Sequence, residues 1–404
     1  MSVLFVHGLV LDGLADSAVQ GWVLVEGERI VATGRGQPGP RVAERTIDLG
    51  GRTILPGLID THVHLAGGDY FPGYEHEPIG IAAVRTAEAA RRTLLAGYTT
   101  VRTASSRDFL DLDVRDAIHM GLTPGPRIIG SGRGITSTGG HQHEVAMEVD
   151  GPDEVRKAVR QHIKRGVDSL KIMMSGGVAT AGLPVQAEQF SVEEVTTAVY
   201  EAHRVGMKVL THSIGLQAIR NAIEGGVDSI DHGQYLDEEC AVRMKQRGIY
   251  LVPTFGPFYY YTEIRKAEDW RIQRAEAIKD QHQRAFRLAM EVGVPIAMGS
   301  DCGAPSRFPN GENALELTLM VRNGMAPGDA VRSGTSEAAR LAGVFDQVGS
   351  VEPGKLADLI VVDGNPLEDI SVLQHKVQLV MKGGTIYRDD LESVVTSSRR
   401  SDCP

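Results

Sequence analysis

The sequence predicts an α/β protein: a (β/α)8 barrel of the TIM type in the centre, with a small β-sandwich domain built from both termini. Two observations predict this fold. Strand-like and helical patterns alternate through the middle of the chain, with eight strand signals over about 250 residues. Short β-segments with hairpin turns occupy both ends. We therefore predict a barrel over residues 56–349 and a β-sandwich over residues 1–55 plus 350–395.

Turn residues mark the β-segments at the two ends. Trp22–Val25 and Arg29–Ala32 flank a Glu-Gly-Glu turn, which predicts a hairpin. Near the other end, Gln378–Met381 and Thr385–Arg388 flank a Lys-Gly-Gly turn, which predicts a second hairpin. Asp358–Val362 is a further β-branched run, so we expect one small sheet to combine both termini.

The central strand signals are short runs rich in apolar and β-branched residues. They are Ile54–Leu65, Thr99–Ala104, Arg127–Gly132, Ser169–Gly176, Lys208–Ser213, Ser229–Gly233, Tyr250–Phe255 and Pro295–Asp301. A doubly wound open sheet is the structural alternative. That fold usually has fewer strands, and no GxGxxG fingerprint follows the first strand here.

The helical patterns between these runs have apolar residues at a spacing near 3.6. Examples are Ile79–Ala96, Pro152–Arg165, Val192–Val205 and Asp237–Arg247. Ser191 followed by Glu194 predicts a capping box at the start of one helix. Glycine stands where several helices should end, at Gly97, Gly166, Gly206, Gly248 and Gly293.

Composition excludes several classes of protein. The 404 residues are 42% hydrophobic and 23% charged, which is ordinary globular usage and excludes disorder, collagen and coiled coil. The formal net charge of −10 lacks the basic footprint expected of a protein that binds nucleic acid or an anionic membrane.

The cysteine count and the N-terminus bear on location. Three scattered cysteines give neither a disulfide framework nor a CxxC motif. The first residues have no signal-peptide pattern, and no apolar run approaches the ~18 residues that a membrane span needs. We therefore expect a cytoplasmic protein without membrane association.

Polar residues stand at the carboxyl ends of the predicted strands, where barrel enzymes place their chemistry. They are His62, His64, His212, His232 and Asp301, and Lys171 lies within the fourth strand. Residues i and i+2 of a strand point to the same side, so His62 and His64 can bind one ion together. A core histidine satisfied by the backbone is the alternative for any single member, but the complete set favours a metal site for Zn²⁺ or a similar ion.

Lys171 is the unusual member of this set. A lysine in a buried strand is costly unless it is paired or neutralised. A salt bridge to a nearby acid is the structural alternative. The functional alternatives are a Schiff-base nucleophile or a metal ligand, the latter only after loss of its charge or conversion by CO₂ to a carboxylate.

These residues resemble the amidohydrolase superfamily over nearly the whole chain. The motifs that carry the resemblance are Leu55–His64 (LPGLIDTHVH) and Gly349–Leu359 (GSVEPGKLADL). Within the superfamily the chain is similar to the imidazolonepropionase-like and metal-dependent dipeptidase (prolidase-like) branch. The features of that branch are Lys171 in its strand, the loop Gly139–His143 (GGHQH) and the segment Asp231–Tyr235 (DHGQY).

The resemblance implies two divalent metal ions, usually Zn²⁺. His62, His64 and Asp301 would hold the first ion, and His212 and His232 the second. Lys171, N-carboxylated, would bridge the two. Imidazolonepropionase itself is mononuclear and lacks the carboxylated lysine, so Lys171 favours the dipeptidase side of the branch. Homo-oligomers are also expected from the resemblance.

The implied reaction is cleavage of an amide bond by hydroxide activated at the metal pair. Asp301 would take a proton from the hydroxide and pass it to the leaving nitrogen. We expect Tyr235 to reach a substrate carboxylate or the developing oxyanion, and His141 or His143 to meet the substrate carbonyl or carboxylate. Arg133 is a further candidate for binding a carboxylate.

Aromatic residues cluster after the seventh predicted strand. They are Phe255, Phe258, Tyr259, Tyr260 and Tyr261, in a chain with only 5% aromatic residues. This clustering predicts an aromatic substrate pocket, with Phe255 and Tyr259 as named contacts. Loop packing or a subunit interface is the alternative.

The sequence thus predicts a hydrolase of dipeptides or N-acyl amino acids, acting on a small substrate with an amide bond. One alternative is a hydrolase of a cyclic amide, carbamate, urea or ester of non-peptide origin. A more remote alternative is a barrel that serves as a scaffold without catalysis, although a scaffold has no need of six converging ligands.

Overall fold

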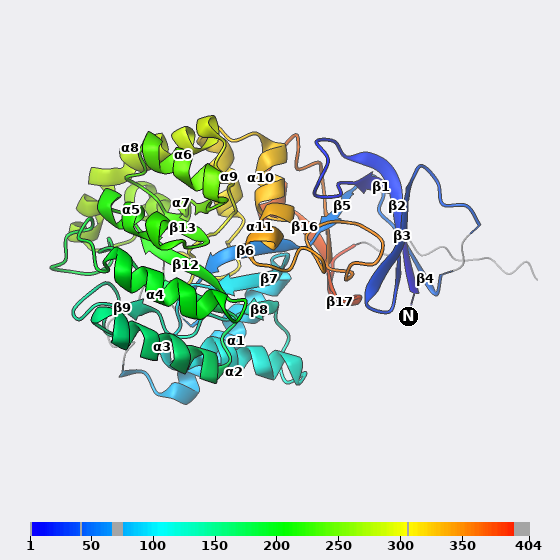
Figure 1. Ribbon diagram of the computed structural model, residues 1–404. Helices are drawn as coiled ribbons and strands as arrows, with labels where there is room; N and C mark the ends of the chain where they lie inside the picture. Colours follow the sequence, from blue (N-terminus) through cyan, green and yellow to red (C-terminus); the bar gives the residue numbers. More distant parts are fainter. Residues whose placement is uncertain (1, 41–42, 67–75, 305–306, 392–404) are drawn as a thin grey trace, which may run out of the picture.

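A computed structural model describes residues 2–40, 43–66, 76–304 and 307–391 of the chain. It is an α/β protein, as predicted. Parallel strands with surrounding helices form the larger part, and a sheet built from both ends of the chain lies beside it (Figure 1). No helix among the described residues is long and apolar enough to cross a membrane.

The terminal sheet has eight strands in the order β17-β16-β15-β5-β1-β2-β3, with β4 paired to β1. Their bounds are β1 Ser2–Val10, β2 Val19–Glu26, β3 Arg29–Arg35, β4 Arg45–Asp48, β5 Thr53–Pro56, β15 Leu359–Val362, β16 Val377–Lys382 and β17 Thr385–Asp389. Both predicted hairpins are confirmed, because β2 pairs with β3 and β16 with β17, each antiparallel. Buried apolar side chains such as Phe5, Val23 and Leu379 form the core of this sheet.

The larger part contains two parallel sheets, in the orders β6-β7-β8 and β10-β9-β11-β12-β13-β14. Their strands are β6 Leu58–Val63, β7 Tyr98–Thr103, β8 Arg127–Ile129, β9 Ile135–Thr136, β10 Met147–Glu148, β11 Ser169–Met173, β12 Lys208–Ser213, β13 Ser229–His232 and β14 Tyr250–Val252. Seven of the eight predicted central runs therefore contain a strand. Parallel pairing places the carboxyl ends of these strands at one edge, where the site lies.

The eighth predicted run, Pro295–Asp301, is not a regular strand. It forms a single parallel bridge between Ile296 and Leu251 of β14. On its other side, the backbone N–H of Thr61 in β6 donates to the carbonyl of Met298, at 3.0 Å. The segment thus lies between β14 and β6 with few ladder hydrogen bonds of its own.

Most helices lie around the parallel strands (Figure 1), whereas the short α12 (Val372–His375) contacts β16 of the terminal sheet. The helices are α1 Ile79–Leu95, α2 Leu110–His119, α3 Gly151–Arg165, α4 Val192–His203, α5 Leu216–Gly225, α6 Glu238–Arg247, α7 Phe255–Tyr259, α8 Asp269–Val292, α9 Leu315–Arg322, α10 Pro327–Ser333, α11 Ser336–Leu341 and α12, with short turns at Arg107–Phe109 and Tyr260–Ile264. The predicted capping box is confirmed at α4, where Ser191 and Glu194 exchange hydrogen bonds. Gly166, Gly248 and Gly293 end their helices in the left-handed conformation, as predicted.

Gly57 divides the first predicted run into two strands of different sheets. β5 joins the terminal sheet, whereas β6 begins the parallel sheet that carries His62. The Gly57 N–H donates to the carbonyl of Asp358, at 2.8 Å. A Cβ atom at position 57 would lie 2.2 Å from the hydroxyl oxygen of Thr99, so only glycine fits at this crossing.

Gly57→Ala should therefore destabilise the fold by about 1–3 kcal/mol, because the added methyl group forces β6 and β7 apart. The free energy of unfolding from chemical denaturation measures this. Gly80→Ala is the matched control, since position 80 is exposed in α1 with open space around it, and alanine should be neutral or slightly stabilising there. Equal stability of the two variants would contradict the steric argument.

Candidate active site

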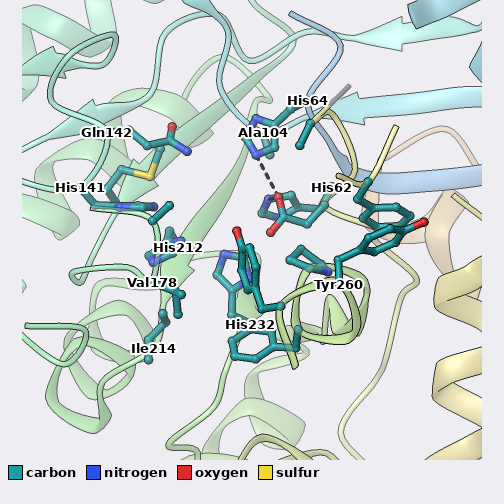
Figure 2. A pocket seen from close by; sticks show the side chains of 18 of the residues that line it. His62, His64, Ala104, His141, Gln142, Val178, His212, Ile214, His232 and Tyr260 are labelled. Carbon is teal, nitrogen blue, oxygen red and sulfur yellow. Dashed lines mark ion pairs between the residues drawn. The ribbon is translucent and has the colours of Figure 1, made fainter. Parts of the chain in front are cut away.

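The six side chains predicted as metal ligands line one cavity. His62, His64, Lys171, His212, His232 and Asp301 come from positions spread over 240 residues, and all border this space. Figure 2 shows the labelled histidines His62, His64, His212 and His232 facing the same region. The predicted convergence at the carboxyl edge of the strands therefore corresponds to a physical site.

His62 and His64 stand at the end of β6 and direct their Nε2 atoms towards Asp301. The distances to Asp301 Oδ1 are 3.5 Å from His62 and 3.1 Å from His64. Burial alone would raise the pKa of Asp301, but the two imidazoles hold that pKa well below its usual range. Asp301 has φ of 55°, a strained conformation that sets its carboxylate against these rings.

His212 and His232 end the neighbouring strands β12 and β13, with ring centroids 4.3 Å apart. His212 Nε2 lies 3.0 Å from the carbonyl of Gly176, and His232 Nδ1 lies 2.7 Å from the Thr254 hydroxyl. Burial holds the pKa of both histidines well below the ordinary value, so both imidazoles are neutral at pH 7. Neutral imidazole is the form that binds metal ions.

Lys171 lies in β11 with its side chain buried. Its Nζ has no hydrogen-bond partner among the described residues, and the carboxylate of Asp231 lies 3.8 Å away. Burial lowers the pKa of Lys171 to about 8, although Asp231 opposes this shift. The amine is therefore more easily deprotonated than an ordinary lysine.

Asp231 and Arg102 form a buried charge pair that was not predicted from the sequence. Asp231 Oδ2 accepts from His62 Nδ1 at 2.7 Å, and Arg102 Nη2 lies 3.8 Å from Asp231 Oδ1. Both side chains are fully buried. The available signal was that each residue is an ionisable group inside a predicted buried strand.

The donor set fits divalent metal ions. Ligand atoms of His62, His232 and Asp301 lie within 4.8 Å of one another. In each of His62, His212 and His232, one ring nitrogen is hydrogen-bonded to a protein oxygen. The other ring nitrogen of each residue is left for a metal ion. Such outer hydrogen bonds orient metal-binding histidines in proteins. His232 Nε2, like Lys171 Nζ, is buried without a hydrogen-bond partner among the described residues.

His141 is the one predicted substrate-binding residue, outside the ligand set, that lines the cavity. Its Nδ1 lies 2.7 Å from the Thr180 hydroxyl, and its ring centroid is 4.2 Å from that of His212. Burial lowers the pKa of His141 to about 3, so the ring is neutral.

Five other predicted site residues do not line the cavity: Arg133, His143, Tyr235, Phe255 and Tyr259. The Arg133 guanidinium instead donates to the carbonyls of Val145 and Ala146, at 3.0 and 2.6 Å. His143 is exposed on its loop, 3.4 Å from Glu144. Their loops turn these polar groups to the backbone or to solvent.

The aromatic residues predicted from the sequence also fall into two groups, those that line the cavity and those that do not. Phe255 is buried beneath the site, with its ring stacked on His282 at 4.3 Å. Tyr235 and Tyr259 pack against apolar clusters. Their neighbours Phe258, Tyr260 and Tyr261 do line the cavity, so the predicted aromatic segment contributes other members than the two named as contacts.

The sequence reading also missed several lining residues. Gln142 and Gln234 border the cavity next to predicted histidines, and Arg307 and Phe308 come from the segment after Asp301. Proximity to His141, His232 and Asp301 in the sequence was the available signal. It was too general to separate residues that face the cavity from those that face away.

Comparison with known proteins decides the family. The amidohydrolase family profile matches residues 53–387. The chain belongs to the amidohydrolase family. Ochratoxinase from Aspergillus niger is 33% identical over 373 residues, which cover 83% of this chain and 75% of that protein.

Two solved structures are similar to this amidohydrolase over nearly its whole length. A Xaa-Pro dipeptidase with methionine in its active site is 36% identical, with a TM-score of 0.87, covering 96% of this chain and 100% of that one. A prolidase in complex with N-methylphosphonate-L-proline is 30% identical, with a TM-score of 0.88 and the same coverage. The predicted superfamily and its prolidase-like branch are confirmed, and the protein is a hydrolase of carbon–nitrogen bonds.

Asp231→Asn should destabilise the metal-free amidohydrolase by about 3–5 kcal/mol, because the change leaves the buried cations Lys171 and Arg102 without their shared anion. Urea denaturation of metal-free protein measures the loss. Glu88→Gln is the control, since Glu88 pairs with Arg91 and Arg92 on an exposed helix face and should contribute less than about 1 kcal/mol. A similar, small loss in both variants would contradict the role given to Asp231.

Proposed function

We propose that this amidohydrolase is a binuclear metal-dependent hydrolase that cleaves the amide bond of a dipeptide or an N-acyl amino acid. The observation that carries the proposal is the convergence of the six predicted ligands on one cavity. The similarity to a Xaa-Pro dipeptidase and a prolidase supports a substrate with a peptide-like bond and a free carboxylate.

In this proposal His62, His64 and Asp301 hold one divalent ion, taken to be Zn²⁺, and His212 and His232 hold the second. Lys171, carboxylated by CO₂ with release of a proton from its amine, would supply a carboxylate ligand to both ions. The lowered pKa of Lys171 and the absence of a hydrogen bond to its Nζ within the described structure support this role, because only the neutral amine reacts with CO₂. When bound, the ions polarise the scissile carbonyl and lower the pKa of water towards about 7.

The side chains of the cavity then divide the remaining tasks. Asp301 accepts the proton of the attacking water and passes it to the leaving nitrogen. His141, neutral and fixed by Thr180, meets the substrate carbonyl or carboxylate. Phe258, Tyr260 and Tyr261 form the apolar wall against which the substrate side chains pack. Tyr235, His143 and Arg133, the other polar candidates from the sequence, do not line the cavity.

The proposed catalytic unit is a closed (β/α)8 barrel over residues 56–349. Hydrogen bonds from the segment Pro295–Asp301 to β6 and β14 support closure on one side. On the other side, the Asp168 N–H before β11 donates to the carbonyl of Gly130 after β8, at 2.8 Å. Residues 1–55 and 350–395 form the β-sandwich domain of this proposal, of which residues 1, 41–42 and 392–395 lie outside the described residues.

A second candidate function is hydrolysis of an amide, carbamate, urea or ester of non-peptide origin. The relative named ochratoxinase supports it, because that name denotes action on a toxin. The aromatic wall of the cavity is compatible with such substrates.

A substrate panel tests the proposed function. Purified, metal-replete enzyme is assayed on dipeptides and N-acyl amino acids, in parallel with lactams, carbamates, ureas and esters. We expect the highest kcat/KM among the dipeptides and N-acyl amino acids, and loss of activity on chelation. Turnover of only the second group would replace the first proposal with the second.

Lys171→Ala should lower the metal content from about two ions per chain and abolish most activity, because the bridging ligand is gone. Elemental analysis of the purified variant measures the first effect. Short carboxylic acids should restore part of the activity by occupying the space of the missing side chain. Metal binding by the wild type that does not depend on CO₂ during reconstitution would count against carboxylation.

Asp301→Asn should reduce kcat by at least about 100-fold while the fold is retained, because the amide cannot carry the proton. Steady-state kinetics with circular dichroism as the folding control measures this. A variant with near-normal kcat would remove Asp301 from the proton transfer.

A further inference from the structure

We propose that Thr254 is a positioning residue that fixes the tautomer of His232 and keeps the Nε2 lone pair of His232 available to a metal ion. The inference rests on the proposed function, because it takes His232 as a metal ligand. Its argument uses a separate observation, the direction of the hydrogen bonds behind the ring.

The Thr254 hydroxyl has a single proton to donate. Its Oγ1 lies 2.6 Å from the carbonyl oxygen of Pro253, which can only accept. The same Oγ1 lies 2.7 Å from His232 Nδ1. Because the hydroxyl proton is used on Pro253, the second hydrogen bond must run from Nδ1–H to Oγ1. A neutral imidazole carries one N–H, so His232 Nε2 is left bare.

A second histidine supports this direction from the other side. His282 in α8 places its Nε2 2.8 Å from the same Pro253 carbonyl. Burial lowers the pKa of His282 to about 4, so this ring is neutral and donates its single N–H. The carbonyl has two lone pairs and can accept from both His282 and Thr254. The whole chain of hydrogen bonds is therefore satisfied in one direction only.

The cavity side of His232 agrees with this assignment. Nε2 is buried and has no hydrogen-bond partner among the described residues, although the ring lines the cavity. In the opposite tautomer His232 Nε2 would carry a proton and could not donate a lone pair to a cation bound near His62 and Asp301. A bare nitrogen is the arrangement that can take a ligand.

The backbone of Thr254 and His232 adopts an energetically unfavourable conformation. Thr254 has φ of 56° and ψ of 57°, and His232 has φ of 77°. The left-handed region is unfavourable for a β-branched residue, so a threonine there calls for a specific reason. Placement of the hydroxyl between Pro253 and His232 supplies that reason.

The test compares Thr254→Val with Thr254→Ser. Valine keeps the β-branched shape but removes the hydroxyl, whereas serine keeps the hydroxyl. We expect Thr254→Val to weaken Zn²⁺ binding by about 10–100-fold, measured by competition with a chromogenic chelator. Thr254→Ser should bind Zn²⁺ nearly as tightly as the wild type. Equal affinity of the valine variant and the wild type would overturn the proposal.

A spectroscopic measurement covers the case in which Thr254→Val fails to fold. Nitrogen-15 NMR of histidine-labelled, metal-free wild type, with the His232 signals assigned from His232→Gln, reports which ring nitrogen carries the proton. Protonated Nδ1 is expected, and protonated Nε2 would overturn the inference. If the wild type binds no Zn²⁺, the proposed function is wrong. The NMR result would still show whether Thr254 fixes the tautomer of His232.

Discussion

The rest of the site depends on the interactions of one buried carboxylate, that of Asp231. It holds the ring of His62 by a 2.7 Å hydrogen bond and lies within 4 Å of both Lys171 and Arg102. Two cations buried this close together would be strongly destabilising without an anion between them. Asp231 therefore makes it possible for the neighbouring strands to bring ionisable groups to the cavity at all.

The register of the parallel strands brings the remaining predicted ligands together. His212 is the β-partner of Asp231, and Ser213 is the β-partner of His232. Neighbouring strands thus deliver His212 and His232 to adjacent positions along the edge, and burial keeps their rings neutral. Oxygens outside the cavity then hold one nitrogen of each ring, so that the cavity receives the other. The orientation of these rings thus comes from Gly176 and Thr254, which do not line the cavity.

Much of the fold and the ligand set could be predicted from the sequence, because both have a local signature. A polar residue within or at the end of a strand-like run, such as Lys171 or His212, is unusual enough to be recognised without a structure. The split at Gly57 was not predicted, although the dipeptide Pro56-Gly57 is a local signal for a break. Which sheet each half joins depends on distant partners, β15 for β5 and β7 for β6.

The contacts made by loops could not be predicted either. Tyr235 and Phe255 lie close in sequence to lining residues, but their side chains pack into apolar clusters. Arg133 has the chemistry of a carboxylate binder, yet two backbone carbonyls occupy its guanidinium. Side-chain direction in a loop is set by tertiary packing, which neither periodicity nor composition reports.

The crossing at Gly57 also limits how far this enzyme can be trimmed. β5 belongs to the terminal sheet and continues through Gly57 into β6 of the parallel sheet. One of its two partner strands is β15, which comes from the far end of the chain. Arg127 in β8 reaches the same region through an ion pair of 2.8 Å with Asp358. A minimal catalytic fragment that ended before Leu359 would expose the edge of β5 just ahead of the His-x-His strand. The terminal sheet thus supports the strand that carries His62 and cannot be removed without exposing β5. Fusion partners are better attached after β17 than inserted before β15.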